Sequence, residues 1–253
     1  RLGRRLRGPP AERGDGDGGP RQEVLAQVGG REPEVAVRHE RGGVASEDRA
    51  VERGIDVRAL FWRFEPHGSP RIVESAFRGD EEERAWLAQR GSRFFARWDH
   101  NPGYCHHQKS WVIDAGQPGE TAFVGWINLH NNSVVPPGHP YMEHKLGSTH
   151  DVYVELRGPA ATDVHHNFVQ RWNEASERGH EHGAWEDPRD LPFPAQASAP
   201  AGEAAVQVTR TVRAGAYSVG TPPPGGEPHA IADGDGSILD QYVAAIAAAR
   251  EAI

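Results

Sequence analysis

The run Ile55-Asp56-Val57-Arg58-Ala59-Leu60-Phe61-Trp62 decides the fold class of this chain. Its β-branched and aromatic residues predict a strand. A short helical segment is predicted just before it, over residues 46–53, with Gly54 placed to end that segment. The run is therefore the second part of a helix-to-strand unit.

The same order repeats downstream. Asp80 and Glu83 have the spacing of a capping box, which predicts a helix that begins there and ends at Gly91. Residues 93–98, Arg-Phe-Phe-Ala-Arg-Trp, predict the next strand. An alternation of helices and strands is typical of an α/β fold.

Three more strands are predicted, over residues 107–114, 121–129 and 152–156. A helix follows over residues 159–178, because apolar residues recur there at every fourth position, at Val164, Phe168 and Trp172. We therefore expect an α/β fold, with a mixed β-sheet flanked by helices.

Composition divides the chain into four parts. Residues 1–45 are predicted to be disordered or weakly ordered, because their Arg-rich and Gly-rich start buries too little apolar surface. Residues 46–178 form the first domain, and residues 179–203, rich in Pro and Ala, form a linker. Residues 204–253 begin a second, truncated domain, with a strand over residues 206–212 and a helix opened by a Ser237 and Asp240 cap.

Charge and cysteine content exclude several classes of protein. A net charge of −8 and a pI near 6.0 argue against a nucleic-acid partner held by broad phosphate neutralisation. The single cysteine, Cys105, excludes an intrachain disulfide and a cysteine zinc site. The histidines lack a consistent ligand spacing, so we predict no metal and no cofactor.

No segment resembles a signal peptide or a transmembrane helix. The location of the protein is therefore left open, with the cytoplasm or the periphery of a membrane favoured. The chain starts without Met and ends inside a helical pattern, from which we expect a fragment at both ends.

Residues 107–114 carry the predicted chemistry. Side chains two apart on a strand share a face, so His107 and Lys109 point together. An imidazole beside an ammonium suits attack on a phosphodiester: the imidazole is the nucleophile, and the cation stabilises charge on the nonbridging oxygens. Asp114 has the opposite parity or sits where the strand ends, so we assign it a supporting role.

The spacing His-x-Lys-x4-Asp, filled by His107, Lys109 and Asp114, resembles the HKD motif of the phospholipase D superfamily. Residues 122–129 look like the strand that follows this motif, although Trp126 replaces a small residue and Asn128 replaces an acid. The corresponding substrate-binding candidates are Gly125, Trp126 and Asn128.

Later segments make the resemblance more specific. Residues 150–161 and 167–172 closely resemble the strand and helix after the first motif, in the eukaryotic-like branch of the superfamily. Residues 237–253 resemble the helix that opens the second half of these enzymes. The resemblance implies a phospholipase D-like sandwich whose second half is incomplete, with the His107 strand near the centre of the sheet.

The resemblance also implies an activity. Such enzymes hydrolyse phospholipid headgroups, or transfer the phosphatidyl group, through a phosphohistidine formed by one motif while the other protonates the leaving alcohol. This chain has only two lysines, Lys109 and Lys145, and Glu143 stands two residues before Lys145, so no second His-x-Lys exists. The implied partners are a phospholipid, a membrane surface, and a C-terminal half or second copy that supplies the other motif.

Two alternatives remain open at this point. A superfamily member can act on another phosphodiester, as a nuclease or a cardiolipin synthase. The chain can also be a noncatalytic, truncated half-domain, and we expect these residues alone to be inactive. In either case an exposed apolar face is expected where a second half would pack.

Overall fold

The computed structural model describes residues 23–28, 47–63, 79–100, 106–126, 151–186 and 189–251. Its strands are β1 (Glu23–Val28), β2 (Asp56–Arg63), β3 (Phe95–His100), β4 (Lys109–Ile113), β5 (Thr121–Gly125), β6 (Tyr153–Arg157) and β7 (Ala184–Trp185). Its helices are α3 (Glu81–Arg90), α4 (Pro159–Asn173), the 3-10 turn η2 (Ile231–Asp233) and α5 (Ser237–Ala248), with a further helical segment over residues 47–52.

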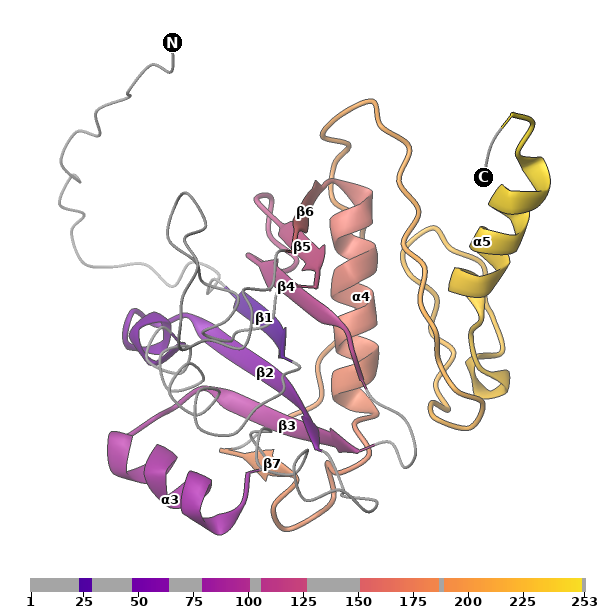
Figure 1. The fold of residues 1–253 in the computed structure, drawn as a ribbon. Coiled ribbons are helices and arrows are strands. Elements are labelled where there is room, and N and C mark those ends of the chain that lie inside the picture. Colours follow the sequence, from indigo (N-terminus) through magenta and orange to yellow (C-terminus); the bar gives the residue numbers. More distant parts are fainter. Residues whose placement is uncertain are drawn as a thin grey trace, which may run out of the picture.

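The strands form one seven-stranded sheet in the order β6-β5-β4-β1-β2-β3-β7 (Figure 1). Strands β1, β2 and β3 run parallel to one another, whereas β4, β5, β6 and β7 pair antiparallel with their neighbours. The predicted mixed α/β sheet is therefore confirmed, and β4 lies beside the central strand β1.

Strand β2 shows why the sheet is covered on both faces. Val57, Ala59 and Phe61 point to one face, where they join a core that includes Leu87 of α3. Leu60 points to the other face, into a core built largely from α4. Alternation along the strand sends successive side chains to opposite faces, so this nearly continuous apolar run needs helices on both sides.

The ends of α3 agree with the sequence prediction. Asp80 Oδ1 accepts a hydrogen bond from the Glu83 backbone N–H at 2.9 Å, and Glu83 Oε2 accepts one from the Gly79 N–H at 2.7 Å. Gly91 ends the helix in the left-handed region, with φ of 69°. These contacts satisfy N–H groups that the first turn leaves unpaired.

The predicted cap of the last helix is wrong. Helix α5 begins after Gly236 without any side-chain cap. Ser237 instead accepts a hydrogen bond from the Arg210 N–H at 3.0 Å and donates one to the Arg210 carbonyl at 3.1 Å. Its hydroxyl joins two segments of chain and so does not serve as the predicted cap.

The structure also differs from the sequence prediction within the first 45 residues. Residues 23–28, expected to be disordered or weakly ordered, form β1 in the middle of the sheet. Strands β2 and β4 pair with β1 on its two sides, so the order of this segment depends on neighbours that are distant in sequence. Composition carries no information about such neighbours.

Three predicted boundaries downstream differ as well. The linker expected over residues 179–203 contains β7, where Trp185 pairs with Ala96 of β3. Residues 206–212 form no strand, and only Val212 makes an isolated bridge, to Asp235. Helix α4 ends at Asn173, five residues before the predicted end, because Ala175 and the turn residues after it pack back toward β3.

Helix α5 exposes several apolar side chains. Its exposed apolar residues are Leu239, Tyr242, Val243 and Ile246. No helix within the residues placed by the structure is long and apolar enough to cross a lipid bilayer.

Candidate functional site

A cleft of about 440 Å³ opens at the start of β4. One wall consists of residues 106–110 and 124–126, from the approach to β4 and the end of β5. Helix α4 contributes Val164 and Asn167, and the opposite wall consists of residues 208–211 and Ile238. Segments that are far apart in the sequence therefore meet around one hollow.

His107 and Lys109 both line this cleft. His107 is exposed and precedes the first residue of β4, whereas Lys109 is 2% exposed. The Lys109 ammonium donates a hydrogen bond to the His107 backbone carbonyl at 3.0 Å. Strand β4 begins at Lys109, two residues later than predicted, so His107 lies just before the strand. The hydrogen bond links the two residues directly.

Trp126 contacts both of these residues. Its ring meets the His107 imidazole edge to face, with centroids 5.3 Å apart, and the Lys109 Nζ lies 6.0 Å from the indole centroid. Aromatic pairs and cation–π contacts at these distances are favourable. Trp126, which the sequence marks as an unusual residue at this position, thus forms the side of the cleft next to the imidazole and the ammonium.

Gly125 lines the cleft for a steric reason. It pairs with Lys109 on one side and with Tyr153 on the other. A Cβ at this position would lie 2.2 Å from the Val152 carbonyl oxygen, which is far inside contact distance. Glycine here allows β6 to approach β5 next to Lys109.

Asp114, by contrast, lies outside the cleft. Asp114 follows the last residue of β4, at the opposite end of the strand from Lys109, and does not line the cleft. It begins a turn, with φ of 54° and its carbonyl accepting from the Gln117 N–H at 2.9 Å. Asn128 falls outside the residues that the structure describes.

The turn that Asp114 begins is held by a buried carboxylate, Glu120. Its Oε1 accepts from the Gly116 N–H at 3.0 Å and from His165 Nδ1 at 2.8 Å. Its Oε2 accepts from the hydroxyls of Thr162 and Ser198, both at 2.6 Å. Burial alone would raise the pKa of Glu120, but the hydrogen bonds from His165, Ser198 and Thr162 lower it from 4.5 to about 2.

Replacing Glu120 with Ala is expected to lower the free energy of unfolding by about 3–5 kcal/mol, since several buried donors lose their partner. The folded-state pKa is depressed, so the contribution of Glu120 is fully present above pH 4.5 and is lost as the pH falls toward 2. Urea unfolding at pH 7 and pH 3 measures both effects. The exposed Glu155, paired with Arg157, provides the matched control Glu155→Ala. An equal fall in the free energy of unfolding in this variant would contradict the stabilising role of Glu120.

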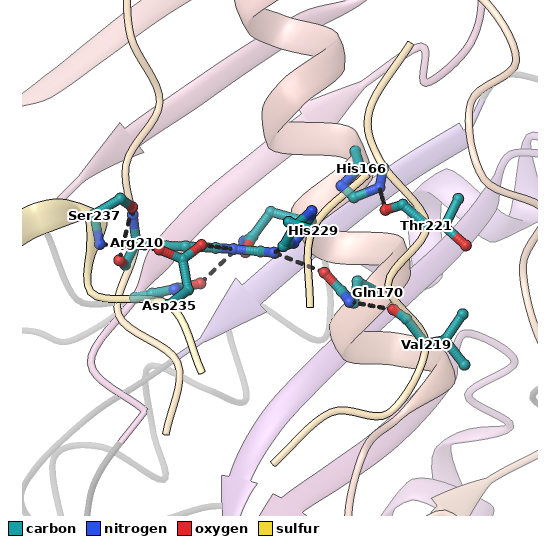
Figure 2. Close-up of polar contacts among 10 residues, drawn as sticks. His166, Gln170, Arg210, Val219, Thr221, His229, Asp235 and Ser237 are labelled. Carbon is teal, nitrogen blue, oxygen red and sulfur yellow. Dashed lines mark hydrogen bonds and ion pairs between the residues drawn. The ribbon is translucent and has the colours of Figure 1, made fainter. Parts of the chain in front are cut away.

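Arg210 fixes the opposite wall of the cleft to α4 (Figure 2). Its Nε donates to Asp235 Oδ2 at 2.9 Å, its Nη1 donates to Gln170 Oε1 at 2.8 Å, and its Nη2 lies 3.4 Å from His229 Nε2. Sequence reasoning missed this residue. The predicted strand over residues 206–212 marked the segment but gave no reason to expect a guanidinium at its centre.

Further contacts hold the same wall. Gln170 Nε2 donates to the Val219 carbonyl at 2.7 Å, and His166 Nε2 lies 2.7 Å from the Thr221 carbonyl, so it donates there in the neutral tautomer (Figure 2). Burial, the largest cause, and nearby Arg210 lower the pKa of His166 to about 4, although the hydrogen bond to Thr221 opposes this change. His166 is therefore neutral near pH 7 and acts as a structural donor.

An Arg210→Met variant is expected to loosen this wall. The substitution keeps an apolar stem and removes four polar contacts, to Asp235, Gln170, His229 and Asn167, so the free energy of unfolding should fall by about 1–3 kcal/mol. Cleavage by trypsin or elastase within residues 204–251 should become faster. The exposed Arg213, in the same segment, provides the control Arg213→Met. Equal rates of proteolytic cleavage in the two variants would contradict the role of Arg210.

Comparison with known proteins adds an independent finding. The chain is 30% identical to phospholipase D gamma 3 of Arabidopsis thaliana over 112 residues, which cover 34% of this chain and 13% of that protein. It is 29% identical to phospholipase D beta 1 of the same plant over 139 residues, which cover 45% of this chain and 12% of that protein. No protein-family profile matches the chain. The chain is thus weakly similar to plant phospholipases D over part of its length, and the similarity spans only a small part of those proteins.

Proposed function

We propose that this chain carries the nucleophilic part of a phospholipase D-type phosphodiesterase that acts on phospholipids. The observation that carries the proposal is that the exposed His107 imidazole and the buried Lys109 ammonium line one cleft, where the ammonium is hydrogen-bonded to the His107 backbone carbonyl. The names of the distant relatives support the same activity. In this proposal residues 46–178 are the first catalytic domain, and residues 204–253 begin the second.

The proposed reaction has two steps. A ring nitrogen of His107 attacks the phosphorus, a P–N bond forms, and the P–O bond to the headgroup breaks. The leaving alcohol takes a proton from an acid that the second motif supplies. Water or another alcohol then attacks the phosphorus and returns a proton to the group that protonated the leaving alcohol. The P–N bond breaks, which gives phosphatidic acid or a new phosphatidyl ester and restores the imidazole.

Lys109 has a separate role in both steps. Negative charge grows on the nonbridging oxygens in each transition state, and a buried ammonium stabilises that charge more strongly than an exposed one. The hydrogen bond to the His107 carbonyl keeps the ammonium next to the nucleophile. Binding and stabilisation of the phosphoryl group are therefore assigned to this residue.

The walls of the cleft favour a lipid over other phosphodiesters. Apolar side chains contributed by β5, α4 and the C-terminal segment include Val124, Trp126, Val164, Val208 and Ile238. Such a lining suits the glycerol and acyl part of a phospholipid. The net charge of −8 disfavours a long polyanion such as a nucleic acid.

Release of choline from phosphatidylcholine tests the proposal. The chain should be assayed alone and as any longer product of the same reading frame, with ethanol added to detect phosphatidylethanol. Choline release with phosphatidylethanol formation in either form supports the proposal. Cleavage of a simple aryl phosphodiester, or of DNA, without any release from phospholipid vesicles would contradict the lipid assignment.

A further inference from the structure

The two residues that flank His107 are both anchored by hydrogen bonds to other elements of the fold. His106 Nε2 lies 2.8 Å from Asp99 Oδ2, at the end of β3. Gln108 Oε1 accepts from Asn167 Nδ2 at 3.1 Å and from Arg171 Nη1 at 3.2 Å, both on α4. His107 therefore lies between two residues whose side chains are bound to different elements of the fold.

A single buried ion pair joins these two anchors. Arg171 Nη2 donates to Asp99 Oδ2 at 3.2 Å, and the side chains are 2% and 5% exposed. The Ser176 N–H donates to Asp99 Oδ1 at 3.1 Å. Asp99, on β3, thus accepts hydrogen bonds from His106 before β4, from Arg171 of α4 and from Ser176 in the turn after α4. These contacts connect four segments of the fold.

The charge states of the groups are consistent with this arrangement. Burial alone would raise the pKa of Asp99, but the hydrogen bond and charge of His106 and the charge of Arg171 lower it below its usual range. Burial, followed by the charge of Arg171, lowers the pKa of His106, although Asp99 opposes this change. Asp99 is ionised near pH 7, and a neutral His106 can donate its Nε2–H to it.

We propose that the Asp99–Arg171 ion pair is a positioning device, which holds His106 and Gln108 so that the His107 imidazole is presented to the substrate in one orientation. Asp99 and Arg171 do not themselves line the cleft, so neither is assigned contact with the reacting atoms. Lys109 completes the arrangement, because its bond to the His107 carbonyl fixes the backbone between the two anchors. This inference rests on the proposed function and adds residues that the HKD motif does not contain.

The expected consequence is a loss of turnover with little change in substrate affinity. Small displacements of a nucleophile lower the rate by about 10²-fold. We expect Asp99→Asn to lower kcat by that amount and to leave KM nearly unchanged. Gln108→Leu removes one anchor, keeps the buried ion pair, and should lower kcat by a smaller factor, about tenfold.

A matched control separates positioning from general loss of stability. Asp56 also lies on a strand of the same sheet, and its carboxylate pairs with Arg58 at 2.9 Å, away from the cleft. Asp56→Asn makes the same chemical change in another ion pair. Its kcat should remain close to that of the wild type in the form of the protein that turns over.

The closing experiment follows the His107 ring by NMR in the chain itself, alongside kinetics. The inference predicts that Asp99→Asn and Gln108→Leu shift the ring resonances and the titration of His107, whereas Asp56→Asn does not. Unchanged His107 signals in both Asp99→Asn and Gln108→Leu, or an equal fall in kcat in Asp56→Asn, would overturn it. If the wild type cleaves no phospholipid, the proposed function fails, and the NMR comparison still decides whether the ion pair positions His107.

Discussion

Replacing His107 with Ala is expected to abolish headgroup release, with kcat/KM lower by at least about 10³-fold. The proposed mechanism has no alternative nucleophile, because the P–N bond forms on this imidazole. The side chain is exposed at the cleft, and its contact with Trp126 is the ring contact that the substitution removes, so the fold should persist. Choline release from phosphatidylcholine, measured in the form of the protein that turns over, gives the result.

His180→Ala is the control for this prediction. His180 is also exposed and lies in the turn after α4, away from the cleft. Its loss should leave kcat/KM unchanged, and both variants should unfold at the wild-type urea concentration. Retention of more than a tenth of the wild-type rate in a folded His107→Ala variant would show that another group attacks the phosphorus.

Replacing Lys109 with Met should have the second-largest effect, a loss of about 10²–10³-fold in kcat. The substitution keeps a side chain of similar length and removes the ammonium that is proposed to stabilise charge on the phosphoryl oxygens. Lys109 is nearly fully buried, and a neutral side chain at a buried charged position is often tolerated or even stabilising. The activity should therefore fall without a matching loss of stability.

Steady-state kinetics on Lys109→Met, together with urea unfolding, test this expectation. A variant that keeps its unfolding midpoint and loses kcat agrees with a role in the transition state. A rise in KM at constant kcat would instead assign Lys109 to ground-state binding. Full activity in Lys109→Met would remove the ammonium from the mechanism.

Local signals in the sequence predicted the elements whose causes are also local. The capping box of Asp80 and Glu83, the C-terminal Gly91 and the apolar run of β2 all appear in the structure as expected. Strand β1 could not be predicted in this way, because its order comes from pairing with β2 and β4. Ser237 likewise bonds to a distant backbone in place of its own helix.

The candidate site shows the same limit. The sequence prediction placed His107 and Lys109 on one strand, whereas β4 begins at Lys109 and a hydrogen bond from the Lys109 ammonium to the His107 carbonyl links the two residues. Asp99 and Arg171, which join the anchors beside His107, and Arg210, which holds the opposite wall, come from other elements, and their hydrogen bonds have no short-range sequence pattern. Tertiary contacts decide which polar residues support a nucleophile.

Detection of a covalent intermediate on His107 is the decisive test of the proposed mechanism. The active form should be mixed with a short-chain phosphatidylcholine, quenched in base to preserve the P–N bond, and digested for mass spectrometry of the peptide that contains His107. A phosphatidyl adduct is expected on His107 and should be absent from His107→Ala. An unmodified His107 during turnover, or an adduct on another histidine of the chain, would contradict it.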